Sequence, residues 1–403
     1  MQACGLIVEY NPFHNGHLFH IEKAKEISQA ECIVAVMSGP FLQRGEPSII
    51  DKYHRTMAAL ENGVDVVVEL PFPYAVESSH LFAVGSVKTL HKIGVSSICF
   101  GSESGDVTDF TDSYSLFKQQ KDVYTATLKR SLEQGQSYPT ASKEAYEKIG
   151  LTSKSFDLSK PNNILGFSYI QAIKNLHLPI QPLTIKRTKS DYHDDSIIGT
   201  IASATSIRKE MLEMSRITEN VQHALPASTV RQLNEYRAKT TFWHTWEAYF
   251  QLLHYRVMMM NPEELRNIHG VIEGLEHRIK KTARSATSIQ DWISAIKTKR
   301  YTWTRIQRIF VHILTNTTKQ EIQHIINNYH IPYVRLLGMT KTGKSYLNSV
   351  KSNMDVPLIS SLKHLHYPMM KLEEKASRAY YSILDPEARH EIWKQEIQPP
   401  IRL

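Results

Sequence analysis

Two histidines three residues apart, His14 and His17, are well suited to chemistry on a phosphate group. They flank Gly16, and they follow an apolar run at 3–8 and a turn that contains Pro12. This order predicts a strand, a tight turn and a helix N-terminus, where unpaired backbone N–H groups attract anions. The imidazoles add donors that are charged or neutral near pH 7. The alternative interpretation is a strand–helix junction with two polar surface histidines.

The pattern His14-x-Gly16-His17 resembles the HxGH signature of the HIGH-type nucleotidyltransferase superfamily, which is shared with the class I aminoacyl-tRNA synthetases. The resemblance implies that the glycine lets adenine approach the backbone. It also implies that both histidines bind phosphate oxygens and stabilise charge on the transferring α-phosphate. Such a transfer requires positioning and positive charge, and it requires no nucleophile from the protein. His14 and His17 are therefore predicted catalytic residues.

A second segment with phosphate-binding chemistry runs from Ser203 to Arg208. Its sequence, SATSIR, resembles the Ser-Ser-Thr-x-Ile-Arg signature of the nucleotidyltransferases, the counterpart of the synthetases' KMSKS loop. The resemblance implies that Thr205, Ser206 and Arg208 hold the β- and γ-phosphates, with Arg208 as a third catalytic residue. Ala204 stands where the family has a serine, so one hydroxyl is missing. By residue types alone, the segment is a helix with a hydroxyl N-cap.

The elements that must position these segments alternate between apolar runs and helical patterns. We expect strands at 3–8, 32–38, 64–70, 97–100 and 181–185, and helices at 16–30, 51–62, 78–93 and 162–176. Short apolar runs separated by helices are typical of a parallel sheet covered on both faces. The predicted fold class is therefore α/β, with a Rossmann-like nucleotidyltransferase domain over 1–215 that binds its ligand at the carboxyl ends of the strands.

Residues at those strand ends form the predicted ATP-binding site. Gly101 follows one strand, where it either permits close approach of a ligand or marks a plain turn. Asn162 begins a helix as its cap or as a nucleotide contact, and Arg187 follows the last strand. Together with both signatures, the predicted ATP-binding residues are Ile7, Val8, Glu9, Tyr10, Asn11, Pro12, Phe13, His14, Asn15, Gly16, His17, Gly101, Asn162, Arg187, Thr188, Thr205 and Ser206.

Two polar loops in this half each allow two interpretations. The loop 38–47, punctuated by glycine and proline, is either a mobile lid over the substrate or an ordinary strand-to-helix connection. The loop 191–195, with three aspartates and one histidine, is either a metal cluster or a solvated loop, and we favour the solvated loop.

The second half differs from the first in charge and in pattern. Residues 1–215 carry a net charge of −3, whereas residues 216–403 carry +11 and read mainly as helices. We therefore expect a basic, mainly helical domain over 216–403 that binds tRNA. Cations that alternate with aromatic residues favour RNA, whereas in the alternative the aromatic residues are core and the cations are solvated. The cations expected to hold tRNA phosphates are Lys299, Arg300, Arg305 and Arg308.

Residues 338–345 satisfy the P-loop pattern GxxxxGK[ST] and follow a possible strand at 331–337. A P-loop domain also needs a further strand that ends in an aspartate for Mg²⁺. The 58 residues that follow contain no such pattern. We therefore expect a basic turn that touches RNA phosphate rather than a nucleotide site.

The composition disfavours several other classes of protein. The chain has no run of about 18 apolar residues, so we expect neither a membrane helix nor a membrane partner, and the apolar run near the start is too interrupted for a signal peptide. Cys4, Cys32 and Cys99 lie in separate apolar runs, as expected for buried, reduced thiols of a cytoplasmic protein. No cysteine or histidine cluster has metal-ligand spacing, so no metal held by side chains is predicted.

The whole chain resembles a bacterial family of tRNA-acetylating nucleotidyltransferases, through GLIVEYNPFHNGHLFH, GPFLQRGEPSIIDKYHR, PNNILGFSYIQAI and RYTWTRIQRIF as well as the second signature. The resemblance implies that acetate and ATP, with Mg²⁺ carried on the ATP, form acetyl-adenylate and pyrophosphate. The acetyl group then passes to N4 of the wobble cytidine of elongator tRNA(Met), leaving N4-acetylcytidine and AMP. The residues by themselves support adenylyl-type chemistry and a polyanionic partner. They leave open a small-molecule adenylyltransferase and a non-catalytic RNA-binding protein.

Overall fold

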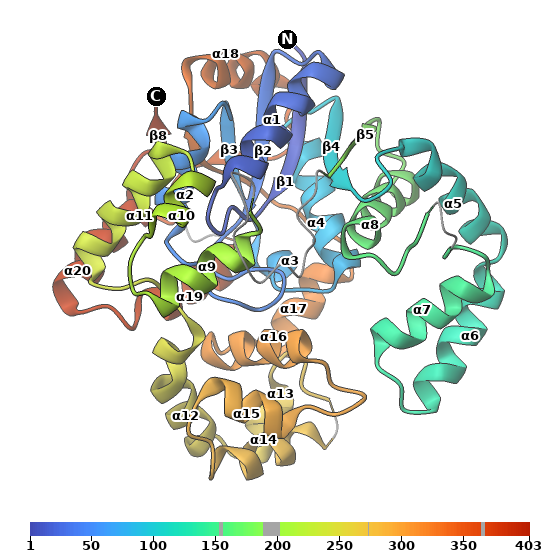
Figure 1. Cartoon of the computed structure of the whole chain (residues 1–403), viewed down its shortest axis with the longest axis vertical. Coiled ribbons are helices and arrows are strands. Elements are labelled where there is room, and N and C mark those ends of the chain that lie inside the picture. The colour runs from blue at the N-terminus through green and yellow to red at the C-terminus, as the bar shows by residue number, and fades with distance from the viewer. Residues whose placement is uncertain (153–155, 188–201, 273, 364–366) are drawn as a thin grey trace.

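The protein is built on one eight-stranded sheet, in the order β5-β4-β1-β2-β3-β6-β7 with β8 beside β6 (Figure 1). The computed structural model describes residues 1–152, 156–187, 202–272, 274–363 and 367–403. Strands β1 to β5 run parallel, and β6 runs antiparallel to β3. The strands are β1 (Ala3–Val8), β2 (Cys32–Ser38), β3 (Val66–Leu70), β4 (Ser97–Ser102), β5 (Gln181–Lys186), β6 (Val334–Met339), β7 (Leu358–Ile359) and β8 (Ile401–Arg402).

Helices fill most of the chain between and after the strands. Those of the first half are α1 (Asn15–Ser28), α2 (Lys52–Glu61), α3 (Phe72–Ala75), α4 (Ser79–Lys92), α5 (Val107–Gln119), α6 (Lys121–Glu133), α7 (Tyr138–Lys148), α8 (Pro161–Asn175) and α9 (Ala204–Glu213). Those of the second half are α10 (Glu219–Ala224), α11 (Ala227–Thr240), α12 (Phe250–Met259), α13 (Pro262–Asn267), α14 (Leu275–Ala283), α15 (Ile289–Ile296), α16 (Trp303–Leu314), α17 (Lys319–Ile326), α18 (Lys341–Val350), α19 (Pro368–Tyr381) and α20 (Pro386–Trp393). Short 3₁₀ helices lie at η1 (Trp246–Tyr249), η2 (Lys351–Asn353) and η3 (Lys394–Ile397).

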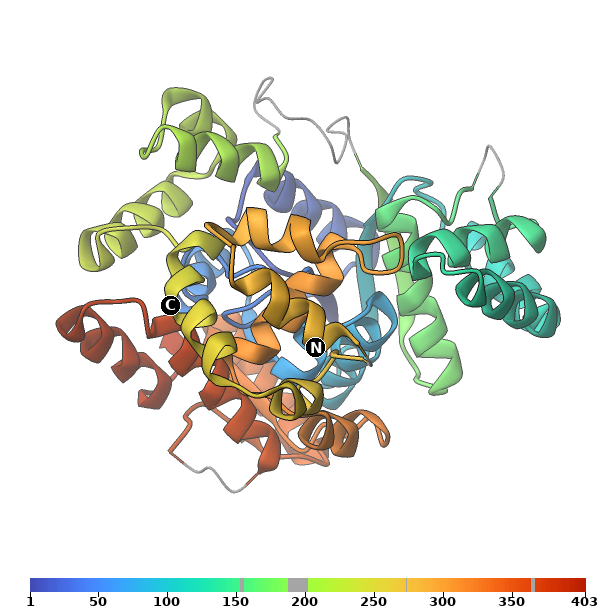
Figure 2. The ribbon, with the colours of Figure 1, turned by 90° about the horizontal axis from the view of Figure 1, so that it is seen from below.

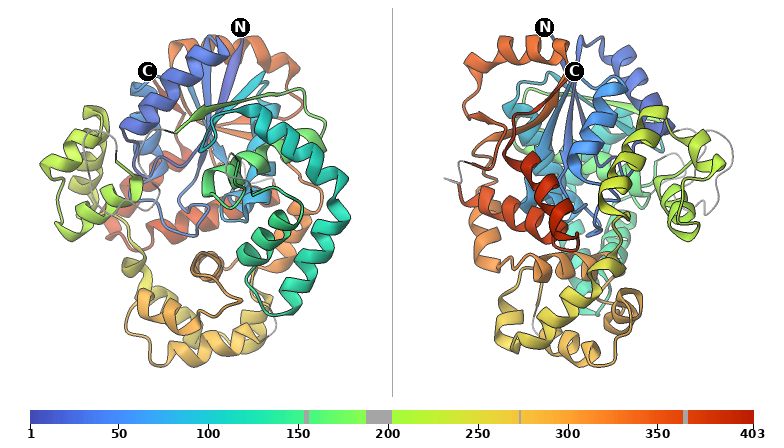
Figure 3. Two further views of the ribbon diagram at one scale, coloured as in Figure 1. Left: turned by 45° about the vertical axis from the view of Figure 1, so that its right-hand side comes forward. Right: turned by 90° about the vertical axis from the view of Figure 1, so that its left-hand side faces the viewer.

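Successive side chains of a strand point to opposite faces of the sheet, and in the parallel strands both sets of side chains are covered. On one face, Leu6 of β1 belongs to a buried cluster with Ile21 of α1 and Leu60 of α2. On the other face, Val36 of β2 belongs to the main core with Leu90 of α4. Helices accordingly flank the sheet on either side when it is seen along its edge (Figure 3, right). This two-sided burial explains why each parallel strand reads as a continuous apolar run.

The α/β fold predicted for the first half is confirmed. Strands β1 and β2 have the expected bounds, β3 begins two residues later than expected, and β4 and β5 run on to Ser102 and Lys186. The four expected helices correspond to α1, α2, α4 and α8, each end lying within two residues of its predicted place. Cys4, Cys32 and Cys99 are buried free thiols.

The sheet continues into the second half of the chain. β6 pairs with the free edge of β3, and β7 and β8 pair with β6. The predicted division at residue 215 therefore does not correspond to a break in the sheet. Helices α12 to α16 lie below the sheet in Figure 1, and Figure 2 looks onto them from below. Within the described ranges, no helix combines the length and the apolar character needed to cross a bilayer.

Candidate active site

A cleft of about 1980 Å³ lies at the carboxyl ends of the central strands. The chain adds β2 and β3 on one side of β1 and then returns to add β4 and β5 on the other, so the strand order reverses between β1 and β4. Ligands of open α/β sheets bind at such a reversal. The lining residues come from these strand ends, from α5 to α8 and from α16. Figure 3 (left) shows α5 to α8 and α16 at the same end of the sheet.

His14 and His17 line this cleft at the first turn of α1, where each caps the helix. The backbone N–H of Gly16 donates to Nδ1 of His14 at 3.1 Å, and the backbone N–H of His14 donates to Nδ1 of His17 at 3.2 Å. The two imidazole rings stack, with centroids 3.8 Å apart. Because both Nδ1 atoms accept, the proton of each neutral ring lies on Nε2.

Both histidines are neutral at neutral pH. Burial, together with the positive charges of Arg187 and Arg208, lowers the pKa of His14 to about 3. Burial also holds the pKa of His17 well below its usual range, with a smaller contribution from His14. The sequence left both charge states open, and the structure favours Nε2–H donors without a formal charge. The positive charge at this end of the cleft therefore comes from the two arginines.

Arg208 connects the two signature segments. Its guanidinium donates to the carbonyl oxygen of Asn11 at 2.8 Å, and it forms an ion pair with Glu46 at 3.3 Å. Asn11 in turn accepts a hydrogen bond from the backbone N–H of Ile49 at 2.7 Å. The turn before the first signature, the second signature and the loop 38–47 are thus held together at one point.

The remaining residues of the second signature divide between the cleft and the helix cap. Thr205 and Ala204 line the cleft. Ser206 is buried, and its backbone N–H donates to the hydroxyl of Ser203, the N-cap of α9, at 3.0 Å. The Ser206 hydroxyl itself donates to the Ser203 carbonyl oxygen at 2.9 Å, and its contact with phosphate stays a prediction.

Gly101, Asn162 and Arg187 meet at the end of β4, as the sequence predicts. Arg187 donates from Nη1 to Oδ1 of Asn162 at 3.3 Å, and a Cβ atom on Gly101 would lie 3.2 Å from Cγ of Arg187. Glu103 fixes the start of α8, because its carboxylate accepts from the backbone N–H groups of Asn162 and Asn163 at 3.3 and 2.8 Å. Glu103 is a positioning residue that the sequence reasoning missed.

Most of the predicted ATP-binding residues line the cleft. Pro12 and Phe13 are buried in the turn, where the Phe13 ring packs on that of Tyr10. Asn15 donates its side-chain amide to the carbonyl oxygen of His223 at 2.9 Å. Thr188 and the loop 191–195 lie outside the residues that the structure describes. The predicted residues found in the lining are Ile7, Val8, Glu9, Tyr10, Asn11, His14, Gly16, His17, Gly101, Asn162, Arg187, Thr205 and Arg208.

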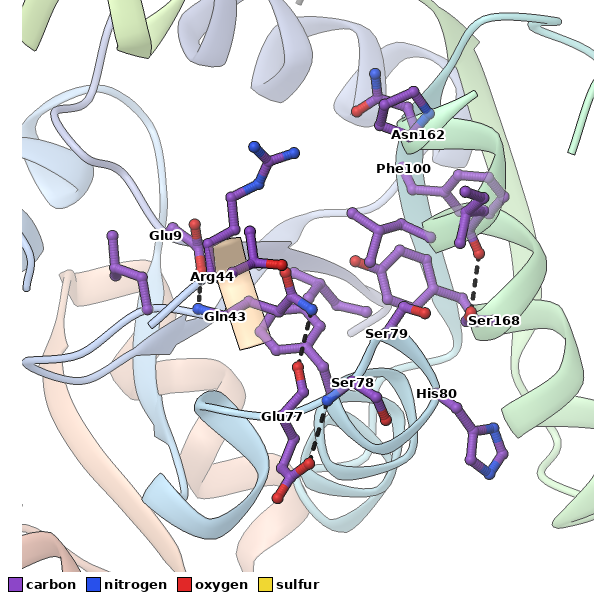
Figure 4. Close-up of a pocket in the computed structure, with 18 of the residues that line it drawn as sticks. Glu9, Gln43, Arg44, Glu77, Ser78, Ser79, His80, Phe100, Asn162 and Ser168 are labelled. Atoms are coloured by element: carbon purple, nitrogen blue, oxygen red, sulfur yellow. Dashed lines mark hydrogen bonds between the residues drawn. The ribbon is translucent and has the colours of Figure 1, made fainter. Parts of the chain in front are cut away.

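The loop 38–47 is anchored on both sides, which favours an ordinary connection over a mobile lid. The backbone N–H of Gln43 donates to the carboxylate of Glu9 at 2.7 Å (Figure 4). The Nε atom of Arg308 donates to the carbonyl oxygen of Gln43 at 2.8 Å. Gly45 has a φ of 79°, and a Cβ atom there would lie 2.4 Å from the backbone nitrogen of Arg308. The loop is therefore packed directly on α16.

The four cations predicted to bind tRNA differ in their exposure and in their position relative to the cleft. Arg305 and Arg308 line the cleft, and Arg305 also stacks on Tyr301, with its guanidinium carbon 5.3 Å from the ring centroid. Lys299 and Arg300 are exposed in the segment before α16. RNA binding by these cations stays a prediction.

The P-loop-like segment 338–345 lies at the other end of the sheet from the signatures. Since β6 is antiparallel to β3, the residues that follow it lie near Asp65, at the amino end of β3. The hydroxyl of Thr340 donates to Oδ1 of Asp65 at 3.0 Å. A Cβ atom on Gly343 would lie 2.0 Å from the Asp65 carbonyl oxygen. The glycine therefore serves close packing of a strand–helix junction.

Two further groups of cleft residues were not predicted from the sequence. The rings of Phe100 and Tyr169 form part of an apolar wall, with centroids 5.7 Å apart. Glu77, His269 and His312 also line the cleft, and one ligand atom from each lies within 4.8 Å of the others, so these three could hold a metal ion. They come from distant segments, and no local spacing could have signalled them.

Comparison with known proteins extends over the whole chain. A family model described as HIGH Nucleotidyl Transferase matches residues 1–396. A protein of Oceanobacillus iheyensis named tRNA(Met) cytidine acetate ligase is 53% identical, with 100% of both chains covered. A Bacillus subtilis protein of the same name is 45% identical over 100% of this chain and 97% of its own. Crystal structures of Thermotoga maritima TmcAL, apo and bound with alpha-thio ATP, have TM-scores of 0.91 and 0.89 at 32% and 31% identity, and they cover 100% of both chains.

Proposed function

The chain belongs to the tRNA(Met) cytidine acetate ligase family of HIGH nucleotidyl transferases, and we propose that it activates acetate with ATP and transfers the acetyl group to N4 of the wobble cytidine of elongator tRNA(Met). The observation that carries the proposal is the meeting of both signatures at one cleft, where Arg208 of the second binds the Asn11 carbonyl before the first. The shared name of the relatives and the alpha-thio ATP bound by the Thermotoga protein support it.

The first step is the formation of acetyl-adenylate. A carboxylate oxygen of acetate attacks the α-phosphorus in line, the bond to the bridging oxygen breaks, and pyrophosphate leaves. The Nε2–H groups of His14 and His17 donate to oxygens of the α-phosphoryl group, where charge develops. Arg208 and Thr205 hold the leaving pyrophosphate, and Arg187 lies toward the α-phosphate. The ATP phosphates would hold any Mg²⁺ that accompanies the nucleotide, and the ion would supply positive charge for the leaving pyrophosphate.

The second step is acetyl transfer to the RNA base. The N4 amine of cytidine attacks the acetyl carbonyl carbon, the bond to the adenylate oxygen breaks, AMP leaves, and N4 gives up a proton. Bases in an anticodon loop are already partly unstacked, so exposing one of them costs little. The cleft of about 1980 Å³ exceeds the roughly 300–1,000 Å³ of sites for a single small ligand, which suits a nucleotide and an inserted base together.

The basic second half of the chain contributes positive charge to one side of this cleft, where a polyanion can bind. Residues 216–403 carry +11, and α16 brings Arg305 and Arg308 to the cleft. We propose that the exposed Lys299 and Arg300 continue this surface toward tRNA phosphates. A protein that acts on tRNA with ATP and acetate works where these substrates are found, so we place it in the cytoplasm.

The proposal is tested by incubating tRNA with the protein, ATP and isotope-labelled acetate, followed by mass spectrometry of the tRNA nucleosides. We expect labelled N4-acetylcytidine that depends on ATP. A product that forms only with acetyl-CoA, or no modified nucleoside at all, would contradict the proposal. A small-molecule adenylyltransferase, the alternative activity, would release an adenylylated product in the absence of tRNA.

A further inference from the structure

A cluster of three side chains lies in the cleft outside both signature segments. Glu77 precedes α4, His269 lies in the turn between α13 and α14, and His312 lies on α16. The Oε1 atom of Glu77 lies 2.5 Å from Nε2 of His269, and the rings of His269 and His312 are 4.8 Å apart in an edge-to-face arrangement. The cluster therefore joins three segments that are distant in the sequence.

His312 carries a buried ring nitrogen without a hydrogen-bond partner among the described residues. The residue is 2% exposed, and the nitrogen in question is Nδ1. A hydrogen bond with the backbone of Val76 favours the protonated ring. Nδ1 is the ring nitrogen left without a partner. A buried polar atom without a partner destabilises the fold, so a bound ligand is a physical explanation for it.

We propose that Glu77, His269 and His312 bind a divalent first-row transition-metal ion of the Zn²⁺ type. Two imidazoles and one carboxylate are the ligand set of zinc sites that keep a fourth position open. His312 fits the pattern of a metal-binding histidine, whose other ring nitrogen is typically fixed by a carboxylate or a backbone carbonyl. The side chains of Glu77 and His269 are 12% and 22% exposed, so the open position faces the cleft.

The geometry needs a small adjustment to hold the ion. Bonds of about 2.0–2.1 Å place tetrahedral ligand atoms roughly 3.4 Å apart, and the three ligand atoms here lie within 4.8 Å of one another. Any pair wider than the tetrahedral spacing must approach by rotation of its side chains. Nε2 of His269 must also lose its proton to bind the metal, with the neutral ring then protonated on Nδ1. Arg308 is the nearby cation that opposes metal binding, because its charge also lowers the pKa of His312.

The carboxylate and the main chain around the cluster are already fixed. The backbone N–H of Ser78 donates to Oε2 of Glu77 at 3.2 Å, and the side chain of Gln43 donates to the Glu77 carbonyl oxygen at 2.8 Å (Figure 4). The backbone N–H of His269 donates to the Thr317 carbonyl oxygen at 3.0 Å. A simple hydrogen-bonded pair of Glu77 and His269 would account for their contact, but it leaves Nδ1 of His312 unexplained.

The test is metal binding by the full chain, measured without ATP or tRNA. The protein is freed of metal with a chelator and titrated with Zn²⁺ by calorimetry, and with Co²⁺ by visible absorption. We expect one ion per chain with a micromolar or lower Kd, and at least tenfold weaker binding in His312→Ala and in the nearly isosteric Glu77→Gln. His80→Ala is the matched control, since His80 lines the same cleft outside the cluster, and it should bind as wild type does.

Three results would overturn the proposal. They are a wild-type chain that binds neither ion, binding that survives unchanged in both variants, and an equal loss in His80→Ala. Thermal melting of each variant without metal identifies any that fail to fold. If His312→Ala is one of these, Glu77→Gln and the rise in Tm of the wild type with Zn²⁺ decide the outcome. The proposal concerns metal binding alone, so its failure leaves the proposed ligase function untouched.

Discussion

The core and the cleft both contain several charged side chains. Those of the core pair with one another, whereas those of the cleft are only partly paired. In the core, Lys52 lies 2.9 Å from Glu69 and 3.1 Å from Glu396, and Arg335 lies 2.9 and 2.6 Å from the same two carboxylates. All four side chains are at most 2% exposed. Two cations thus pair with two carboxylates away from solvent, and a third buried carboxylate, that of Glu373, lies 3.7 Å from Arg335. This network ties α2, β3, β6 and η3 into one body.

In the cleft, nitrogen donors outnumber the carboxylates that face them. His14 and His17 present Nε2–H groups, Arg187 is exposed, and Arg208 pairs with Glu46 while still lining the cavity. These donors are therefore available to bind an anionic ligand. The contrast teaches that mutual pairing marks charges that hold the fold, and incomplete pairing around a cavity marks charges that bind a ligand.

The largest effect on stability is expected in the core. Arg335→Ala leaves buried carboxylates without their partner and should lower the free energy of unfolding by about 3–5 kcal/mol. Urea unfolding measures this loss. The matched control is Arg378→Ala, because Arg378 forms an ion pair with Glu374 at 2.7 Å but its side chain is 64% exposed; it should cost less than about 1 kcal/mol. Equal losses in the two variants would break the comparison.

The two regions should also respond to acid in different pH ranges. His14 has a pKa of about 3 when folded and 6.5 in its ordinary state, so below pH 6.5 the unfolded chain binds a proton that the folded chain rejects. The free energy of unfolding should therefore fall as the pH drops, by up to about 1.4 kcal/mol per pH unit from this group. The cations around Glu396 lower its pKa from 4.5 to about 2, so its stabilisation is present above 4.5 and is lost below it.

Urea unfolding between pH 7 and pH 2 separates the two contributions, because only that of His14 changes between pH 6.5 and 4.5. Between pH 6.5 and 4.5, His14→Gln should reduce the slope of the free energy of unfolding against pH by up to the value for one proton. Half-buried His20 and buried His244 contribute to the same range, because their pKa values are lowered to about 4 and 3. An unchanged slope in His14→Gln would mean that this histidine is not kept neutral by the fold.

A smaller and more specific effect is expected at the exposed cations. The double variant Lys299→Glu, Arg300→Glu should raise the KM for tRNA, and it should reduce the slope of log affinity against log salt by about one for each phosphate that the protein no longer neutralises. Acetate-dependent ATP–pyrophosphate exchange without RNA should stay the same. Lys371→Glu on α19 serves as a single charge-reversal control. Unchanged tRNA affinity in the double variant would remove this segment from the RNA surface.

The smallest effect is expected at the P-loop-like segment. Lys344→Ala should leave ATP affinity unchanged, because α18 begins at the other end of the sheet from both signatures. Calorimetry with ATP and without tRNA measures this. A large loss of affinity would mean that the segment binds nucleotide after all.

The sequence was sufficient for the parts of the fold that have a local signal. The strands before His14 and Gly101 are continuous apolar runs, and the signatures mark the two helix N-termini that meet at Arg208. Contacts between segments that are distant in the sequence have no such local signal. β7 and β8 have only two residues each, too few for a recognisable pattern. Arg335 is not recognisable as a buried charge from the sequence, because its partners Glu69 and Glu396 lie far away along the chain.

The same limit applied inside the candidate site. Ser206 matches a phosphate-binding signature, but in the structure its hydroxyl donates to the Ser203 carbonyl oxygen at the start of the same helix. The loop 38–47 has the composition of a lid, but Arg308 and Glu9 anchor it from two distant segments. The cluster of Glu77, His269 and His312 exists only after folding. Residue types therefore predicted which groups are available, and tertiary packing determined which of them face the cleft.

The most direct measurement is acetate-dependent ATP–pyrophosphate exchange without RNA, compared between wild type and His17→Ala. If the cleft forms acetyl-adenylate, wild type exchanges only with acetate present, and the variant loses about 10²–10³-fold in rate, the effect of losing one preorganised donor. Its free energy of unfolding should fall by only about 1 kcal/mol, the cost of a weakened helix cap. Exchange at the wild-type rate in the folded His17→Ala protein would contradict the assignment of this cleft as the adenylation site.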